Sequence, residues 1–167
     1  LAALYPAILR VAQGHIEGGD ILVTGREVLV GRSARTDAAG IAAFTALVAP
    51  WGHQVREVLT PPGVLHFKTD CALLAPDTIL STARLAASGC FDGYRVVLVP
   101  EAEAAAANVI RFNDVVLMPA GFERTRDIIA AAGFSPVQIG NSECAKLDGG
   151  MSCLSLRFAP LRGDRQD

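Results

Sequence analysis

Apolar and polar residues repeat one local pattern three times along the chain. In residues 21–30, 72–81 and 109–118, an apolar run is followed by a short polar break and then by a second apolar run. The three breaks are Thr-Gly, Pro-Asp and Asn-Asp, residue types that favour turns or tolerate left-handed backbone. Each segment therefore predicts a β-hairpin, although apolar periodicity alone leaves short strands and helices ambiguous.

A helix-like stretch and a further apolar strand follow each predicted hairpin. In the first repeat, we expect Ser33 to cap a helix that runs through Leu47 and leads to a strand over residues 54–60. In the second repeat, we expect a helix over residues 82–87 and a strand over 94–99. In the third, we expect a helix over residues 123–132, capped at its C-terminus by Gly133, and a strand that begins at Pro136. This order predicts an α/β fold of three diverged ββαβ units, with an ordinary α/β sandwich as the alternative.

Other segments of the chain are less regular. Residues 101–108 predict a short helix because alanine and glutamate favour helices, and residues 152–158 predict a closing strand. The first ten residues resemble the interior of a helix, and they lack an initiator methionine, a basic stretch and a cleavage site. They therefore predict no signal peptide, and we expect the chain to begin partway through a larger protein.

The composition is that of a folded domain with an unusually apolar surface. Of the 167 residues, 51% are hydrophobic and 19% are charged, and 15 basic against 17 acidic side chains give a net charge of -2. The high share of hydrophobic residues argues against disorder, and the nearly neutral charge argues against binding to nucleic acid. The apolar stretch at residues 38–51 is too short to cross a membrane. We expect one domain over residues 1–167. The mean hydropathy of +0.35 predicts an apolar face toward an N-terminal portion or a second copy.

The cysteines and histidines do not form a metal-binding pattern. The four cysteines have no Cys-x-x-Cys spacing, and the three histidines are scattered. This argues against a structural zinc site, and a chain with this much core has no need of a disulfide framework. We expect reduced thiols in the cytoplasm, with one of them reactive, and neither a metal nor a cofactor.

Several polar residues beside the hairpins are left without a structural reason. They are Glu17, Asp20, His66 and the run 148–153, which ends at Cys153. If the units are related by rotation, their connecting segments converge, and a thiolate, an imidazole and a carboxylate could then perform covalent hydrolysis. Additional carboxylates would suit a cationic electrophile. Taken singly, each residue also fits a polar turn, a structural histidine or a half-buried strand position.

Four segments together carry a family resemblance. They are residues 15–40, which begin HIEGGD and contain SARTD, and residues 65–74 (LHFKTDCALL), 111–122 and 146–158, which contain LDGGMSC. In this order they resemble the dimethylarginine dimethylaminohydrolase family of the guanidino-modifying penteins. The resemblance covers nearly the whole chain. It implies a five-bladed α/β propeller of ββαβ units around a central channel, of which this chain holds about three blades.

The resemblance also implies the chemistry. Cys153 matches the nucleophile that attacks the guanidinium carbon of a methylated arginine. His66 matches the group that protonates the departing amine and then activates water. Glu17 matches the acidic member of the triad. The products would be citrulline and an alkylamine, and the mechanism uses no metal.

Residues around the triad would bind the substrate. Arg35 matches an arginine that binds the substrate's α-carboxylate, a role suited to a forked guanidinium. Leu147, through its backbone carbonyl, and Asp148 match the pair that lines the substrate site before the nucleophile. Asp20 is a further candidate carboxylate for the cationic substrate.

One position distinguishes related activities. Arginine deiminases carry Asp two residues after the histidine, whereas this chain has Lys68, as the dimethylarginine hydrolases do. Asp37 and the pair Thr69-Asp70 differ from the residues that are common in the family at these positions. These differences leave the identity of the substrate less determined than the class of reaction. A deiminase or amidinotransferase of the same fold, and a non-catalytic binding module, are the alternatives. Because the family's first two units are not in the sequence, we expect this polypeptide alone to be inactive or very weak.

Overall fold

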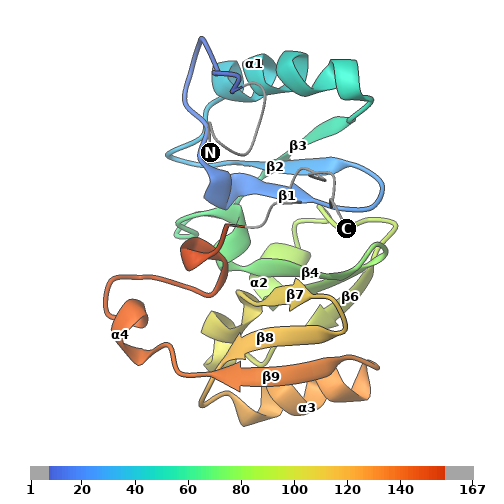
Figure 1. Ribbon diagram of the computed structural model, residues 1–167, viewed down its shortest axis with the longest axis vertical. Helices are drawn as coiled ribbons and strands as arrows, with labels where there is room; N and C mark the ends of the chain where they lie inside the picture. The colour runs from blue at the N-terminus through green and yellow to red at the C-terminus, as the bar shows by residue number, and fades with distance from the viewer. Residues whose placement is uncertain (1–7, 157–167) are drawn as a thin grey trace, which may run out of the picture.

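The protein consists of three small sheets stacked along one direction, as the computed structural model shows for residues 8–156, apart from the side chain of Leu154 (Figure 1). The sheets contain, in order, β1 (Ile21–Val23), β2 (Val28–Arg32) and β3 (Val55–Leu59); β4 (Cys71–Ala75), β5 (Thr78–Ser81) and β6 (Arg95–Leu98); and β7 (Ile110–Phe112), β8 (Val115–Pro119) and β9 (Ser135–Ile139). Two helices cover the ends of the stack in this view, α1 (Ala38–Val48) at the top and α3 (Glu123–Ala131) at the bottom.

All three sheets share one topology. The first strand pairs antiparallel with the second, and the second pairs parallel with the third. Parallel neighbours need a crossover connection, which α1, the short helix α2 (Ala83–Ala86) and α3 provide in turn. The three predicted hairpins and the ββαβ order are therefore confirmed. The predicted strands over 54–60, 94–99 and from Pro136 are also present.

Of the two predicted helix caps, one is confirmed and one is wrong. Thr82 caps α2 by accepting from the backbone of Leu85, and Gly133 follows α3 with φ 96. The prediction that Ser33 caps the first helix is wrong. Asp37 is the cap, with its carboxylate accepting from the Gly40 backbone at 2.7 Å, because the Ser33 hydroxyl is engaged by another carboxylate.

The chain also differs from the prediction near its end. Instead of a strand from residue 152, the backbone forms the 3-10 helix η5 (Ser152–Leu154), after the short helix α4 (Ser142–Ala145). The backbone N–H of Ser152 is bound by a side-chain carbonyl from elsewhere, so it cannot join a sheet. The remainder of that predicted strand, from residue 157, lies outside the described residues. The predicted helix over 101–108 is the 3-10 helix η4 (Glu101–Ala107), kinked at Glu103.

The first ten residues were expected to lie inside a helix. Residues 1–7 lie outside the described residues, and residues 8–10 have no regular secondary structure. No helix within residues 8–156 is long and apolar enough to cross a membrane.

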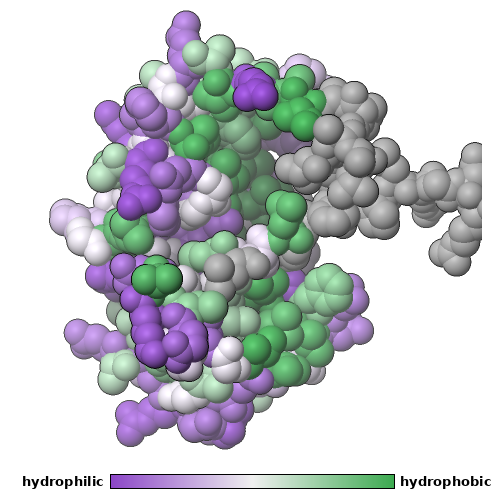
Figure 2. Space-filling view, turned by 60° about the vertical axis from the view of Figure 1, so that its left-hand side comes forward, coloured by the Kyte–Doolittle hydropathy of each residue, from purple (hydrophilic) through white to green (hydrophobic). Residues whose placement is uncertain are grey.

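Large apolar side chains remain exposed at many points. They include Val23, Trp51, Leu59, Leu98 and Phe112. Figure 2 shows polar side chains on the left of one face and apolar ones gathered toward its right-hand edge, on both the upper and the lower part. The exposed apolar surface explains why the mean hydropathy is high for a folded domain of this size.

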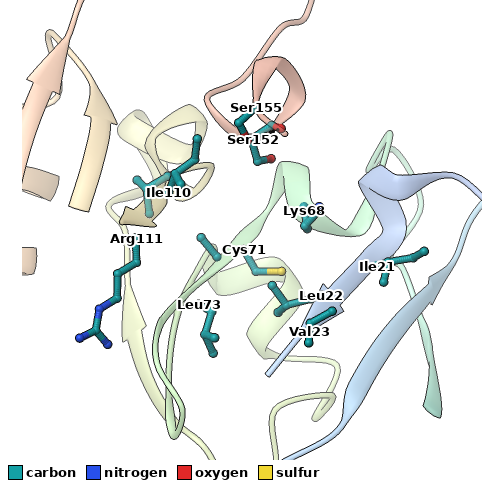
Figure 3. A pocket seen from close by; sticks show the side chains of 12 residues that line it. Ile21, Leu22, Val23, Lys68, Cys71, Leu73, Ile110, Arg111, Ser152 and Ser155 are labelled. Atoms are coloured by element: carbon teal, nitrogen blue, oxygen red, sulfur yellow. Dashed lines mark hydrogen bonds between the residues drawn. The ribbon is translucent and has the colours of Figure 1, made fainter. Parts of the chain in front are cut away.

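The first strands of the three units surround a common pocket. It has a volume of about 240 Å³ and is lined by residues of β1, β4 and β7 (Figure 3). Lys68, Ser152 and Ser155 also border it, from the loop segments above these strands.

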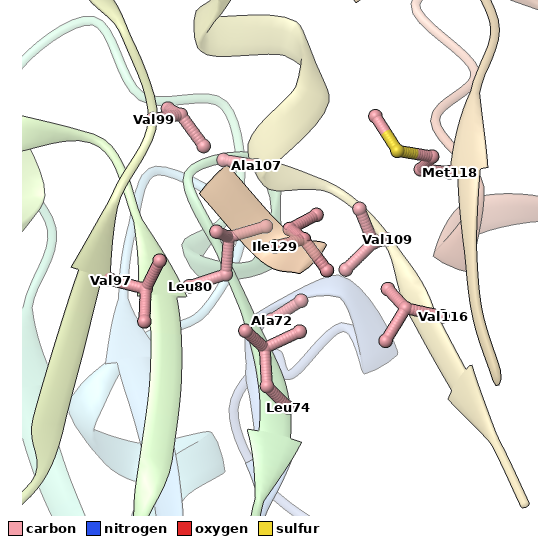
Figure 4. Packing of buried hydrophobic residues seen from close by; sticks show 10 residues of the cluster. All are labelled: Ala72, Leu74, Leu80, Val97, Val99, Ala107, Val109, Val116, Met118 and Ile129. Atoms are coloured by element: carbon pink, nitrogen blue, oxygen red, sulfur yellow. The ribbon is translucent and has the colours of Figure 1, made fainter. Parts of the chain in front are cut away.

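Two hydrophobic cores join the units. One lies between the second and third units, where Leu74, Leu80, Val116 and Ile129 are fully buried or nearly so (Figure 4). The other lies between the first and second units around Phe67. Because these cores tie neighbouring units together, the loops at the strand ends are held at fixed positions relative to one another.

Candidate active site

Glu17 and His66 form the most closely paired polar contact in the predicted site. Glu17 precedes the 3-10 helix η1 (Gly18–Asp20), and His66 precedes the 3-10 helix η3 (Phe67–Thr69). Although they are 49 residues apart, the Nε2 atom of His66 lies 2.5 Å from Oε2 of Glu17. The His66 side chain is 16% exposed and that of Glu17 is 43% exposed. The pair is thus sheltered on the histidine side and open to solvent on the carboxylate side.

The electrostatics of this pair fix the histidine tautomer. The hydrogen bond from His66, assisted by the charge of Arg35, lowers the pKa of Glu17 below its ordinary value of 4.5 against the opposing effect of partial burial. The carboxylate is therefore ionised and can only accept, so Nε2 carries the hydrogen and donates it. In this tautomer the other ring nitrogen, Nδ1, carries a lone pair and can accept a proton.

Gly19 makes room for the imidazole ring. A Cβ atom at this position would lie 2.7 Å from Cγ of His66 and 2.9 Å from its Cδ2. At Gly18, one residue earlier, a Cβ atom would meet nothing within 4 Å. Of the two glycines in this motif, only Gly19 is required by the packing of His66.

Asp20 lies beneath the pair and ties two loops together. It is fully buried; its Oδ1 atom accepts from the backbone N–H of Phe67 at 2.8 Å, and its Oδ2 atom accepts from the hydroxyls of Ser33 and Thr36 at 2.8 and 2.6 Å. These bonds anchor the residue that follows His66 to the loop that carries Arg35. The assignment of Asp20 to substrate binding stays a prediction.

Arg35 is close enough to interact with the pair. Its Nη1 atom lies 3.5 Å from Oε2 of Glu17, and its side chain is half exposed. Its backbone N–H donates to the Ser33 hydroxyl at 3.1 Å, which fixes the start of the loop. A guanidinium in this position can neutralise Glu17 and can also reach an anion in solvent.

Burial distinguishes the four cysteines. Cys71 and Cys90 are buried, and burial raises the pKa of both thiols, which disfavours the reactive thiolate. Cys144 is partly exposed, and Cys153, in η5, is exposed. The thiol predicted as the nucleophile is thus the most accessible of the four.

The sequence analysis missed a residue that contacts Cys153. Asn108 is 5% exposed, and its Nδ2 atom lies 3.8 Å from Sγ of Cys153. Its Oδ1 atom accepts from the backbone N–H of Ser152 at 2.8 Å. Its only signal in the sequence is that it is a polar residue at the end of an alanine run, directly before an apolar strand.

The segments that carry His66 and Cys153 border the same groove. This groove of about 780 Å³ is lined by Leu65 and Thr69 on one side and by Gly150 and Met151 on the other. Figure 3 shows the η3 and η5 segments side by side above the first strands, with Lys68 on one and Ser152 on the other. The fold therefore brings the histidine loop and the cysteine loop together.

The two other predicted binding residues lie on the cysteine loop. Asp148 lines the groove and has φ 57, a left-handed conformation that aspartate tolerates. The Leu147 side chain is 86% exposed, and its backbone N–H donates to the carbonyl of Cys144 at 3.0 Å. Neither residue contacts Glu17 or His66 in a recorded hydrogen bond within the described part of the chain.

Known proteins are similar to this chain in sequence and in fold, although no family model matches it. It is 39% identical over 147 residues to N(G),N(G)-dimethylarginine dimethylaminohydrolase of Pseudomonas aeruginosa, covering 88% of this chain and 58% of that protein. A structure of a cysteine-to-serine variant of the Pseudomonas aeruginosa protein, complexed with citrulline, matches with a TM-score of 0.83 at 38% identity, over 88% of this chain and 57% of that one. The structure of an inosamine-phosphate amidinotransferase from Streptomyces griseus matches with a TM-score of 0.78 at 13% identity, over 91% of this chain and 49% of that one.

The repeated ββαβ units around a shared pocket, and the fold shared with these proteins, define three units of a pentein-type α/β propeller. The predicted fold class is therefore confirmed. Within this class, the chain is similar in sequence and in fold to the dimethylarginine dimethylaminohydrolases. It spans a little over half the length of the curated relative, 58%.

Proposed function

We propose that the protein containing this chain is an enzyme that hydrolyses Nω-methylated arginine to citrulline and an alkylamine. The observation that carries this proposal is the 2.5 Å hydrogen bond between His66 and Glu17, together with the groove that the His66 loop shares with the segment before Cys153. The name of the Pseudomonas aeruginosa relative and the citrulline in its structure support the same substrate class.

The first half of the reaction forms a covalent bond to sulfur. The thiolate of Cys153 attacks the planar guanidinium carbon, and a C–S bond forms. The bond from this carbon to the methylated nitrogen then breaks, and that nitrogen leaves as an alkylamine with a proton supplied by His66. Glu17 keeps the imidazole oriented and stabilises its charged form.

The second half restores the enzyme. Water attacks the carbon of the covalent intermediate while His66, now neutral, accepts a proton from it. The C–S bond breaks, the Cys153 thiolate leaves and citrulline is released. Of the two protons of the water, one returns to His66 and the other is released to solvent, where the departed amine takes up a proton. One methylated guanidinium and one water thus give one citrulline and one alkylammonium ion, so atoms and charge balance.

The remaining predicted residues have roles in substrate binding in this proposal. Arg35 binds the α-carboxylate, because its forked guanidinium matches a carboxylate and its side chain is half exposed beside Glu17. Asp148 and the carbonyl of Leu147 face the cationic end of the substrate. For Asp20, the buried hydrogen bonds favour a supporting role in holding the His66 loop. A reactive free thiol suits a reducing compartment, and we place the activity in the cytoplasm.

A comparison of two substrates tests this function. The protein in its full natural length is incubated with Nω-methyl-L-arginine or with L-arginine, and citrulline, methylamine and ammonia are measured. We expect citrulline and methylamine in equal amounts from the methylated substrate. Ammonia from arginine with no methylamine from methylarginine would instead indicate a deiminase, and no citrulline from either would overturn the proposal.

Gly19→Ala gives a local test of the histidine's position. The added methyl group displaces the ring of His66, so we expect kcat/KM for citrulline formation to fall about 10- to 100-fold while the fold is retained. Gly18→Ala is the matched control, because its Cβ meets no neighbouring atom. Equal activity of the two variants would contradict the role assigned to Gly19.

A further inference from the structure

The side-chain amide of Asn108 reaches the base of the cysteine loop from another unit of the fold. Asn108 ends η4 and precedes β7, whereas Cys153 lies in η5, 45 residues later. Within the described part of the chain, the amide has two recorded contacts, and both are to this loop: Oδ1 with the backbone N–H of Ser152 and Nδ2 with Sγ of Cys153. Asn108 is nearly fully buried whereas Cys153 is exposed, so the amide reaches the sulfur from the interior of the protein.

The orientation of the amide follows from its neighbours. A backbone N–H can only donate, so the amide atom that faces Ser152 at 2.8 Å must be the oxygen. The NH₂ group is therefore the part that faces the sulfur, at 3.8 Å. Asn108 thus presents a fixed hydrogen-bond donor to Cys153.

A glycine in the loop permits this approach. A Cβ atom at Gly150 would lie 2.2 Å from Nδ2 and 2.6 Å from Cγ of Asn108. Any side chain at this position would push the amide away from the loop. The second glycine of the DGGMSC run therefore serves the contact between Asn108 and the nucleophile segment.

We propose that Asn108 is a positioning residue for Cys153, whose amide holds η5 through Ser152 and whose NH₂ group stabilises the thiolate at the nucleophilic sulfur. A donor pointed at sulfur favours its charged form over the neutral thiol, because the anion is the stronger acceptor. The inference rests on the proposed function only in taking Cys153 as the nucleophile.

The charged groups near η5 come from several elements. Lys68 of η3 and Arg111 of β7 border the pocket that Ser152 and Ser155 also line, and Asp148 lies in the groove beside Gly150. These charges stay the same in every variant that changes Asn108 alone. A variant that changes only the donor at Asn108 separates its effect from theirs.

Alkylation of the thiol measures this effect directly and needs no turnover. The full-length protein is treated with 2-chloroacetamidine across a range of pH, the rate of labelling at Cys153 is followed by mass spectrometry, and the pH at half-maximal rate is compared between variants. Asn108→Asp keeps an acceptor for Ser152 but places a carboxylate oxygen against the sulfur. We expect the half-maximal pH to rise by about one unit or more, so labelling below it slows about 10-fold.

Asn141→Asp is the matched control. Its Nδ2 atom donates to the backbone carbonyl of Gly149 at 3.0 Å, so it holds the same loop without contacting the sulfur. We expect its pH profile to match the unaltered protein. Equal shifts in both variants, or none in Asn108→Asp, would overturn the proposal.

Asn108→Ala removes both contacts and provides a second measurement. We expect a smaller rise in the half-maximal pH, because no anion is introduced, and a profile unchanged from the natural protein would also contradict the proposal. Labelling of Cys153 without any citrulline formation would refute the proposed function while leaving the effect of Asn108 measurable.

Discussion

Cys153→Ser eliminates citrulline formation from Nω-methylarginine, with an expected loss of about 10⁴-fold or more in kcat. A serine hydroxyl is hardly ionised near neutral pH, whereas a cysteine thiol ionises far more easily and is the better nucleophile. The measurement is the steady-state rate of citrulline release by the full-length protein.

Cys144→Ser is the control for this substitution. Cys144 is the other cysteine that is not buried, and it lies in α4, just before the loop that carries Cys153. We expect this variant to keep at least half of the activity. If Cys144→Ser were the inactive variant and Cys153→Ser the active one, the nucleophile would be assigned to the wrong residue.

Glu17→Gln is expected to lower kcat by about 10²–10⁴-fold without unfolding the protein. The neutral amide can still hydrogen-bond to His66, but it no longer fixes the hydrogen on Nε2 or stabilises the charged ring. Because the Glu17 side chain is 43% exposed, its replacement leaves no buried charge unpaired. Glu57→Gln, which removes a partner of Arg32 in a surface pair at 3.3 Å, is the control and should leave kcat unchanged.

The pH dependence of the Glu17 contribution has a definite sign. Since the hydrogen bond from His66 lowers the pKa of Glu17 below 4.5, the stabilisation by this pair is present above that value and is lost as pH falls through the lowered pKa. Between pH 5 and neutrality, the carboxylate stays charged. We therefore expect any loss of activity in that range to arise from groups other than Glu17 and to persist in the residual activity of Glu17→Gln. An acid limb that disappears in Glu17→Gln would contradict the assignment.

Local sequence patterns predicted the repeated architecture because its signals are short-range. The turn residues, such as Thr24-Gly25 and Asn113-Asp114, lie between apolar runs that can form strands on either side. Each unit therefore contains enough local information to define its hairpin. The parallel third strand follows because a helix separates it from the second.

The errors occur where a polar group is bound by a side chain from a distant segment. Ser33 does not cap α1, since its hydroxyl donates to Asp20, and Asp37 takes its place. The predicted strand at 152 is a 3-10 helix, with the Ser152 N–H bound to Asn108. Such partners are 13 and 44 residues away, beyond the reach of periodicity.

The candidate site depended on two kinds of information. Chemistry alone selected a carboxylate, a histidine and a cysteine, and the family resemblance paired Glu17 with His66, which the structure brings to within hydrogen-bonding distance. Neither source selected Gly19 or Asn108, because their importance lies in close packing that only the fold reveals. The remaining role assignments stay predictions.

The central claim is that Cys153 forms a bond to a guanidinium-type carbon while the His66–Glu17 pair handles protons. Intact-mass and peptide mass spectrometry of the full-length protein incubated with S-methyl-L-thiocitrulline, whose carbon also carries a leaving group, tests it most directly. We predict one covalent adduct per chain, mapped to Cys153, that accumulates in Glu17→Gln because its hydrolysis is slowed. An adduct on a different cysteine, or none in either protein, would contradict the account.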